Sequence, residues 1–273
     1  MAILGIDVGG TFTDAVLLKD GELRTAKVPT ARNQEESVLA AAAAVGAGEL
    51  ERFTHGTTIA TNALLERRGA RTALVTTEGF EHVLHLRRQD RAHLYRLCAA
   101  HPEPLVPLQR SFGVRGRIGP EGELEPLDLA TLPDAGDVEA IAVCLLFAFR
   151  DPSHEQAVAA ELRRRHPSAH VVASHESAPE FREYERASTT TADAYLGPLL
   201  SRYLRALAER CGEASLPVPL IMRSSGGVAT LEEAAAHAAR ALLSGPAAGV
   251  VGAARAAREA GIANALAFDM GGT

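Results

Sequence analysis

The pentapeptide Asp-x-Gly-Gly-Thr occurs at residues 7–11 and again at 269–273, each time directly after an apolar stretch. At average residue frequencies, one match is expected about once per hundred thousand positions, so the repeat is not accidental. Two glycines let the backbone adopt positive φ and approach an oxyanion, while backbone N–H groups and the Thr hydroxyl donate to phosphate. An Asp at the strand end suits hydrated Mg²⁺. The pattern predicts two turns that grip a polyphosphate from both sides.

A plain hairpin turn is the alternative for either copy taken alone. The chain also lacks the G-x-x-x-x-G-K-[ST] motif of a P-loop, and neither copy carries the P-loop lysine. The repeat therefore indicates a different kind of phosphate-binding device.

Strands and helices must position these turns. We expect strands at 3–7, 12–18, 23–28, 71–76, 140–149, 170–174, 220–223 and 264–269, and helices at 34–45, 59–68, 153–165, 181–210, 231–238 and 247–260. Asp20-Gly21 predicts a two-residue hairpin turn. Asn33 and Ser153 are expected to cap helices, Gly69 to end one, and Gly197-Pro198 is a candidate interruption. The alternation of strands and helices is typical of an α/β fold.

The composition argues against several classes of protein. The chain has 273 residues and a net charge of −6, with 4% aromatic residues and no Trp, which argues against a nucleic-acid binder. The longest apolar run, 140–149, is too short for a membrane span of about 20 residues. The first residues lack a basic segment, so we expect no signal peptide and a cytoplasmic protein. Cys98, Cys144 and Cys211 fit neither a disulfide framework nor a zinc site, and Cys144 is expected in the core.

Longer motifs carry a resemblance to a known family. DVGGTFTD, HGTTIATNALLERRGARTALVTTEGF, EYERASTTTADAYLGP, SSGG, SGPAAGVVGA and DMGGT follow one another over nearly the whole chain, which resembles the hydantoinase A/oxoprolinase family. The resemblance implies an α/β, ribonuclease-H-like (actin-like ATPase) fold with a mixed sheet. It implies an N-terminal domain over residues 1–178 and, over 179–273, the beginning of a second related domain. We therefore expect a fragment, inactive on its own.

The resemblance also implies an activity. Members of the hydantoinase A/oxoprolinase family open cyclic amides such as hydantoins or 5-oxoproline with ATP, by phosphorylating the carbonyl oxygen. This implies ATP and Mg²⁺ as cofactors, a small cyclic amide as substrate, a B-type partner subunit and an oligomer. Three alternatives remain open: a small-molecule kinase of the same superfamily, a non-catalytic ATP-binding activator module, and a subunit of an ATP-dependent ketone carboxylase.

The resemblance assigns roles to individual residues. The nucleotide contacts would be Gly9, Gly10, Thr11, Thr13, Asp269, Gly271, Gly272 and Thr273. Asp7 and Asp14 would be catalytic, ordering the nucleophile or the metal, and Asp7 and Asp269 would bind the metal. In the HGTT-x-A-T-N stretch, His55 would be a catalytic hydrogen-bonding group, and Thr57, Thr58 and Asn62 would face the substrate. A His near a strand end is also commonly a structural residue, so both interpretations of His55 stay open.

Other features have a structural interpretation beside a functional one. Glu183 and Arg186 have the spacing of an i, i+3 ion pair on a helix. Ser244-Gly245-Pro246 either starts a helix or offers an open helix N-terminus to an anion. The sequence differs from the usual family pattern at Asp193, where Asn is expected, and at Arg223–Ser225, where Gln-Ser-Asn is commoner. Residues 85–107 indicate an excursion from the core whose packing the sequence does not define.

Overall fold

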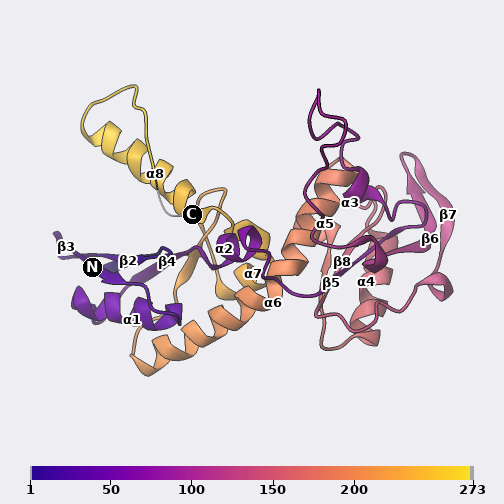
Figure 1. The fold of residues 1–273 in the computed structure, drawn as a ribbon. Helices are drawn as coiled ribbons and strands as arrows, with labels where there is room; N and C mark the ends of the chain where they lie inside the picture. Colours follow the sequence, from indigo (N-terminus) through magenta and orange to yellow (C-terminus); the bar gives the residue numbers. More distant parts are fainter. Residues whose placement is uncertain (1, 271–273) are drawn as a thin grey trace. The chain divides into compact units, whose positions relative to one another are not determined.

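The computed structural model describes residues 2–270 and divides the chain into two compact units (Figure 1). The first unit contains the residues up to Glu66 and those from Leu199 onward, and the second contains Arg67–Pro198. Each unit is built around its own β-sheet. The predicted phosphate-binding residues Gly271, Gly272 and Thr273 lie outside the described residues.

The sheet of the first unit has the strand order β11-β10-β4-β1-β2-β3. Its strands are β1 (Ala2–Val8), β2 (Phe12–Lys19), β3 (Glu22–Pro29), β4 (Arg52–Thr57), β10 (Leu220–Met222) and β11 (Val228–Ala229). β1, β2 and β3 form an antiparallel meander, and β4 and β10 continue the sheet in parallel with β1. The hairpin at Asp20-Gly21 is confirmed, since both residues have the positive φ of a type I′ turn, 51° and 84°.

Helices of the first unit are α1 (Gln34–Ala44), α2 (Ile59–Leu65), the later part of α6 (Glu183–Glu213), α7 (Leu231–Ala236) and α8 (Ser244–Glu259), with a 3₁₀ turn over Ala238–Ala241. Leu4, Ile6 and Val8 alternate along β1 into the core, as expected for a strand with one buried face. Leu200 and Leu204 of α6 are also buried. The buried face of β1 thus extends to Val8, beside Asp7, where the first Asp-x-Gly-Gly-Thr motif begins.

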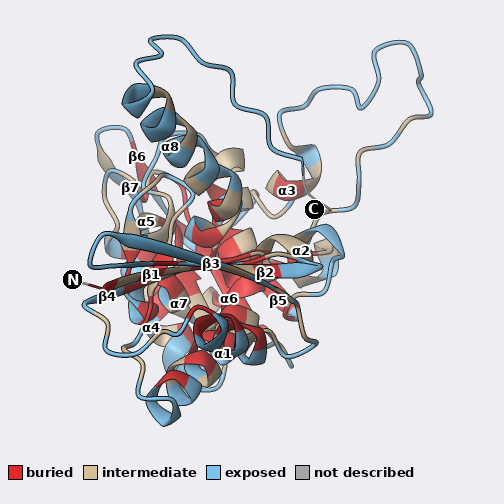
Figure 2. Cartoon of the chain, turned by 90° about the vertical axis from the view of Figure 1, so that its left-hand side faces the viewer, coloured by how far each residue is buried: buried red, intermediate tan, exposed pale blue. Residues whose placement is uncertain are grey.

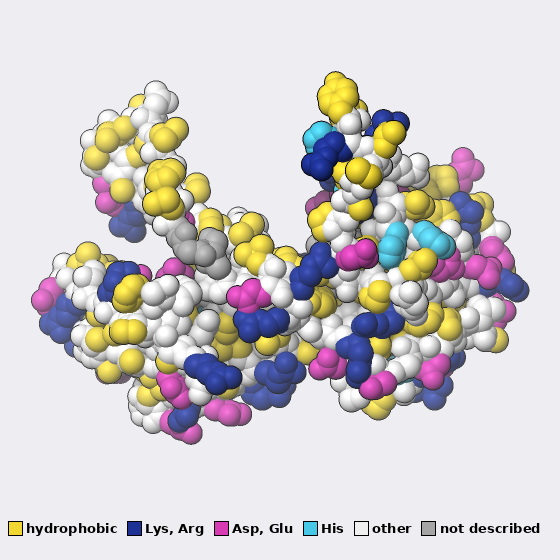
Figure 3. All heavy atoms as spheres, in the orientation of Figure 1, with side chains coloured by type: hydrophobic (Ala, Val, Ile, Leu, Met, Phe, Trp, Pro, Cys, Tyr) yellow, Lys and Arg dark blue, Asp and Glu magenta, His cyan; other side chains and the backbone are white. Residues whose placement is uncertain are grey.

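α8 is exposed along nearly its whole length, and its only buried residue is Ser244 (Figure 2). Figure 3 shows hydrophobic side chains on the surface of this helix. Val250 and Val251 are among its exposed residues. The helix begins at Ser244, earlier than predicted. The strand predicted over 264–269 is absent from the structure, because no described strand pairs with these exposed residues and an unpaired strand leaves its backbone groups unsatisfied.

The sheet of the second unit has the order β7-β6-β5-β8-β9. Its strands are β5 (Thr72–Thr77), β6 (Ser111–Gly119), β7 (Gly122–Asp128), β8 (Ala140–Cys144) and β9 (His170–Ala173), and its helices are α3 (Val83–Leu86), α4 (Ser153–Arg165), α5 (Ser174–Ser177) and the first part of α6, with 3₁₀ turns over Leu108–Arg110 and Leu129–Thr131. Both faces of β8 are buried: Ile141 and Val143 in one core cluster, Ala142 and Cys144 in another. This explains its continuous apolar sequence.

Several predicted helix ends are wrong. α2 ends at Leu65, and Arg67, with φ 54°, takes the left-handed conformation expected of Gly69. A glycine is required at position 69 for a different reason: a Cβ there would come within 2.2 Å of the Tyr195 ring. Asn33 and Ser153 make no capping hydrogen bond: Asn33 lies at the cap position and donates to Glu36, and Ser153 is the first residue inside α4.

α6 runs without interruption through Pro198. Burial of Leu196 and Leu200 on either side of the proline holds the helix in place despite the lost backbone donor. The strand predicted over 140–149 ends at Cys144, and the chain then turns, with Phe147 at φ 57°. No helix among the described residues is long and apolar enough to span a membrane.

The interpretation of Glu183 and Arg186 as an ion pair is wrong. Arg186 is fully buried and donates to Ser174 Oγ at 3.0 Å and to the carbonyl oxygen of Leu145 at 2.6 Å. Buried Glu155 accepts from the same Ser174 hydroxyl at 2.7 Å and from His175 Nδ1 at 2.6 Å. These bonds lock α4, α5 and α6 together at the end of β8.

Candidate functional site

The first Gly-Gly turn joins β1 to β2. Gly9 N–H donates to the carbonyl of Phe12 at 3.0 Å, and a Cβ at Gly9 would lie 3.0 Å from that same oxygen. Gly10 has no atom within 4 Å of the position its Cβ would occupy. Neither glycine has positive φ, so the predicted reason for the pair is wrong. Gly9 allows the turn to be tight, and Gly10 leaves open space over it.

Thr30 stabilises this turn by two hydrogen bonds, a role that the sequence did not indicate. Its hydroxyl donates to the carbonyl of Gly9 at 2.9 Å, and its backbone N–H donates to the carbonyl of Thr11 at 2.9 Å. Thr13 is fully buried, and its hydroxyl lies 3.0 Å from Thr30 Oγ1. Since Thr30 already donates to Gly9, Thr13 is the donor of this bond. Thr13 therefore supports the turn and is not placed to contact a nucleotide, whereas Thr11 is exposed beside the turn.

Asp7 is the last but one residue of β1 and is exposed overall, with its carboxylate partly buried. A Cβ at Gly56 would come within 2.5 Å of Asp7 Oδ1, and a Cβ at Gly245 would lie 4.0 Å from the same atom. Three motifs therefore meet at this oxygen: the Asp-x-Gly-Gly-Thr repeat, the HGTT stretch of β4, and the Ser-Gly-Pro start of α8. The missing side chains of the two glycines leave room for the carboxylate.

Carboxylates gather around this point. Asp7 and Asp14 are direct neighbours across the β1–β2 ladder, and Asp14 is bound by Lys27 Nζ of β3 at 2.6 Å. Partial burial raises the pKa of Asp7, and the negative charges of Asp14 and Asp269 raise it further. Asp269, from the second copy of the repeat, is thus close enough to Asp7 for their charges to interact.

The residues after β4 bind the end of β1. Thr58 donates its hydroxyl to the carbonyl of Val8 at 3.1 Å, and Asn62 Nδ2 donates to Thr58 Oγ1 at 3.4 Å. Asn62 Oδ1 is buried and accepts no hydrogen bond within the described part of the chain. An amide oxygen in that state is available to a ligand that brings an N–H group.

The same segment anchors the start of α8. Thr57 is buried, and its carbonyl lies 3.5 Å from Ser244 Oγ. Thr61 Oγ1 accepts from the backbone N–H of Leu243 at 3.1 Å. Thr57 is therefore placed by its backbone and is not exposed to a substrate.

His55 is a core residue and does not face a cleft. Its side chain is fully buried, with Nδ1 3.3 Å from the carbonyl of Ile6 and Nε2 2.7 Å from the hydroxyl of Tyr203. Since a carbonyl only accepts, Nδ1 carries the proton and Nε2 accepts from Tyr203. Burial lowers the pKa of His55 to about 4 against the weaker effect of the Ile6 carbonyl. The predicted catalytic contact of His55 with substrate is therefore wrong, and the structural interpretation holds.

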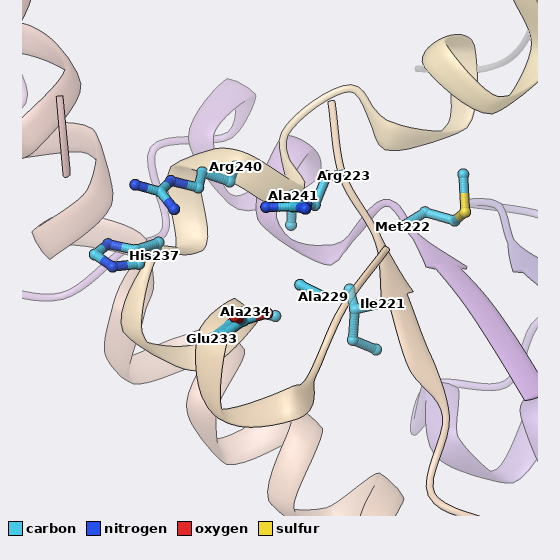
Figure 4. A pocket seen from close by; sticks show the side chains of 9 residues that line it. All are labelled: Ile221, Met222, Arg223, Ala229, Glu233, Ala234, His237, Arg240 and Ala241. Carbon is cyan, nitrogen blue, oxygen red and sulfur yellow. The ribbon is translucent and has the colours of Figure 1, made fainter. Parts of the chain in front are cut away.

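A small hollow between β10 and α7 contains the Arg223 that departs from the family pattern (Figure 4). Arg223, His237 and Arg240 line it together with Ile221 and other residues. Its volume of about 10 Å³ is at most that of one water molecule. This hollow is therefore too small for a substrate.

A divalent cation fits the carboxylates at the end of β1, because it would relieve the repulsion that raises the pKa of Asp7. Mg²⁺ takes one or two protein carboxylates and keeps water and phosphate oxygens as its other ligands. Asp7 and Asp269 suit that role, whereas Asp14 is already bound by Lys27. Residues 2–270 contain no group of three or more His, Cys, Asp or Glu side chains placed as a complete metal cage.

Comparison with known proteins identifies the family. The model of the hydantoinase/oxoprolinase N-terminal region matches residues 3–166, and that of hydantoinase/oxoprolinase matches residues 186–273. The chain belongs to the hydantoinase/oxoprolinase family.

Named members of the hydantoinase/oxoprolinase family resemble almost the whole chain. Caprolactamase subunit alpha of Pseudomonas jessenii is 35% identical over 99% of this chain and 42% of its own length. The acetophenone carboxylase gamma subunit of Aromatoleum aromaticum is 34% identical over 99% of this chain and 41% of its own. The crystal structure of the ATP-dependent caprolactamase from Pseudomonas jessenii matches with a TM-score of 0.83 and 33% identity, covering 99% of this chain and 42% of that one.

These matches confirm the mixed-sheet, actin-like ATPase fold. The chain spans about 42% of the length of the caprolactamase subunit that it matches. Both curated relatives are named as subunits, so these members of the family work in assemblies of more than one kind of chain.

Proposed function

We propose that the protein binds Mg²⁺-ATP at the Asp7 site and uses it to open the ring of a cyclic amide. The observation that carries this proposal is the convergence at Asp7 Oδ1 of Gly56 and Gly245, beside the open turn at Gly10. The two glycines leave room for the Asp7 carboxylate, and the turn at Gly10, where a Cβ would meet no atom within 4 Å, leaves open space for phosphate oxygens beside it. The names of the relatives, an ATP-dependent caprolactamase among them, support the reaction class.

The chemistry follows from the weakness of an amide as an electrophile. The amide nitrogen donates electrons into the carbonyl, so water attacks it slowly. In the proposed reaction the carbonyl oxygen attacks the γ-phosphorus and ADP departs with the electron pair of the broken P–O bond. Water then adds to the activated carbon, the C–N bond breaks and the released nitrogen takes a proton, which leaves an acyl phosphate. A second water hydrolyses the acyl phosphate to the carboxylic acid and inorganic phosphate. Such a site works chiefly by positioning and by charge neutralisation.

Residues of this chain have separate tasks in that reaction. The N–H groups of the turn at Gly9 and Gly10, with the Thr11 hydroxyl, would bind phosphate. Asp7 and Asp269 would hold Mg²⁺, which neutralises phosphate charge when bound. Asn62 Oδ1, buried and unpartnered within the described residues, would accept the N–H group of the ring. Thr58 holds Asn62 in place and is proposed to lie on the same side.

Other parts of the proposed active site would be supplied from outside this chain. We propose that the rest of the protein and a B-type subunit complete the site within an oligomer. The 273-residue chain alone would bind nucleotide without turning over a substrate.

The decisive test is ADP release by the full-length protein together with a B-type subunit encoded alongside it. We expect stimulation by at least one of caprolactam, hydantoin and 5-oxoproline, with the ring-opened product detected by mass spectrometry. Stimulation only by a ketone with bicarbonate would replace hydrolysis with carboxylation, which the resemblance to the acetophenone carboxylase subunit keeps as the second candidate. A stable phosphorylated product would indicate a kinase, and ATP binding without stimulation an activator module.

A further inference from the structure

A second cavity lies wholly within the second unit and has a volume of about 260 Å³. This is just below the range of about 300–1,000 Å³ that is usual for small-molecule sites. It is bounded by α3, the segment before β6 and the first turns of α6, with these lining residues: Arg67, Leu84, Arg87, Pro102, Glu103, Pro104, Leu105, Tyr184, Ser188 and Thr191. The excursion whose packing the sequence left undefined thus forms one wall of a pocket.

One lining group is buried and has no partner among the described residues. Thr191 is 1% exposed, and its hydroxyl makes no hydrogen bond to any group of residues 2–270. Its neighbour Thr190 shows the ordinary arrangement in a helix, with the hydroxyl donating to the carbonyl of Arg186 at 2.7 Å. A buried hydroxyl that forgoes a hydrogen bond lowers stability, and such a group in a native structure calls for an explanation. Thr191 is one of the residues that line this cavity.

Two cations line the same cavity. Arg67 donates through Nη2 to the carbonyl of Glu103 at 2.6 Å, and Arg87 donates to the carbonyl of Pro102. No carboxylate in the described part of the chain lies within ion-pair distance of either guanidinium. Their backbone carbonyl partners orient the two guanidinium groups without neutralising their charges.

The rest of the lining defines the ligand. Leu84 and Leu105 with the two prolines supply an apolar wall, and Glu103 supplies one negative charge. The lining side chains therefore carry two positive charges and one negative charge. That balance suits a monoanion better than a phosphate dianion, which Glu103 would repel.

We propose that this cavity binds a small organic monocarboxylate. Its carboxylate accepts hydrogen bonds from Thr191 Oγ1, Arg67 and Arg87, and its hydrocarbon part lies against Leu84 and Leu105. Binding satisfies the buried hydroxyl and compensates the guanidinium charges. The inference stands independently of the ATP site, because every residue that carries it belongs to the second unit.

The test titrates the whole chain with pentanoate and, in parallel, with the neutral isostere pentanamide, by isothermal calorimetry and ligand-detected NMR. We expect pentanoate to bind and pentanamide to bind at least tenfold more weakly, because only the anion is recognised by charge. Thr191→Val should weaken pentanoate binding by about tenfold, the usual effect of losing a hydrogen bond to a charged group. Arg87→Gln should weaken it similarly.

Matched variants keep the test specific. Thr190→Val removes a bonded hydroxyl from the adjacent position, and Arg88→Gln removes a guanidinium that is paired with Glu185 and does not line the cavity. Both should bind pentanoate like the parent. Equal affinity for pentanoate and pentanamide, no binding of pentanoate, or unchanged binding by both Thr191→Val and Arg87→Gln would overturn the proposal.

Two further arms separate this site from the nucleotide site and identify the source of the ligand. Asp7→Asn should leave pentanoate affinity unchanged, so failure of the ATP proposal does not remove this one. In the full-length enzyme, a higher KM for the amide substrate in Thr191→Val with unchanged kcat would identify the ligand with the substrate or its ring-opened acid. Unchanged kinetics with retained pentanoate binding by the parent would identify it as a separate carboxylate.

Discussion

Gly56 lies directly against the carboxylate of Asp7: a Cβ at position 56 would approach Asp7 Oδ1 to 2.5 Å. The two residues are also register partners in the parallel β1–β4 ladder. The HGTT stretch therefore contributes to the site chiefly through the absence of a side chain, which leaves the carboxylate its position at the strand end.

We expect Gly56→Ala to push the Asp7 carboxylate out of place. ATP affinity of the chain, measured by calorimetry with Mg²⁺, should fall by tenfold or more, because a displaced carboxylate cannot position the metal. The thermal midpoint should also fall, since the neighbouring backbone must shift. Retention of the parent affinity would show that Asp7 does not contact the nucleotide complex.

Gly10→Ala separates ligand binding from folding. A Cβ there meets no protein atom within 4 Å and the backbone φ is not positive, so the thermal midpoint should change by less than about 2 °C. ATP affinity should nevertheless fall by about tenfold, because the methyl group occupies space proposed for phosphate. Gly48→Ala, equally unobstructed, is the control and should change neither quantity. A Gly10→Ala chain that binds ATP normally would place the phosphates elsewhere.

Asp7→Asn should raise the thermal midpoint of the nucleotide-free chain by a few degrees at pH 7. The pKa of Asp7 is raised in the folded chain, so ionisation of this group opposes folding as pH rises through that pKa, and the neutral amide removes the penalty. Mg²⁺-ATP should stabilise the parent and not the variant. Glu22→Gln, in an exposed ion pair on the adjacent hairpin, is the control. A lower midpoint in Asp7→Asn would contradict this account.

His55 should make stability depend on pH. Its pKa is lowered to about 4 in the fold, whereas an unfolded His titrates near pH 6.5, so the unfolded chain binds the proton first as the solution is acidified. The free energy of unfolding should fall by about 3 kcal/mol between pH 6.5 and pH 4 from this group. Denaturant titrations at several pH values measure the slope, which should be shallower in His55→Gln. Equal slopes would mean that His55 titrates normally in the folded chain.

The thiols should differ sharply in reactivity. Cys98 is exposed, whereas Cys144 and Cys211 are buried, and burial raises the pKa of each buried thiol to about 11. Since the thiolate is the nucleophile, a disulfide reagent at pH 8 should label the native chain at Cys98 and label all three only after denaturation. Cys98→Ser should abolish native labelling. Rapid labelling of Cys144 in the native chain would contradict its place in the core.

Local chemistry made part of this structure predictable. Asp20-Gly21 fixes a hairpin by its own backbone preference, the apolar strands follow from their sequence pattern, and α1 follows from its alanines with Glu35 and Glu36 in its first turn. These inferences succeed because neighbouring residues determine them. The repeat at Asp7 and Asp269 predicts a phosphate site at the end of β1, and this stays a prediction.

Other features depend on partners distant in sequence. Gly69 is required by the Tyr195 ring, and Arg186 bonds to Leu145 and Ser174 instead of its helical neighbour Glu183. A strand over 264–269 needs a pairing strand, which periodicity does not supply. The role of His55 likewise depends on a distant residue, because only the fold shows that its Nε2 is hydrogen-bonded to the Tyr203 hydroxyl.

The exposed helix α8 is attached to the first unit at one end. Leu243, directly before the helix, is bonded to Thr61, and Gly245 neighbours Asp7, while the 16 residues of the whole helix span about 24 Å at the usual rise of 1.5 Å per residue. The residues that begin this helix thus adjoin the Asp7 carboxylate, while most of its length is left uncovered. A partner that packs along α8 would therefore touch an element that starts at the proposed nucleotide site.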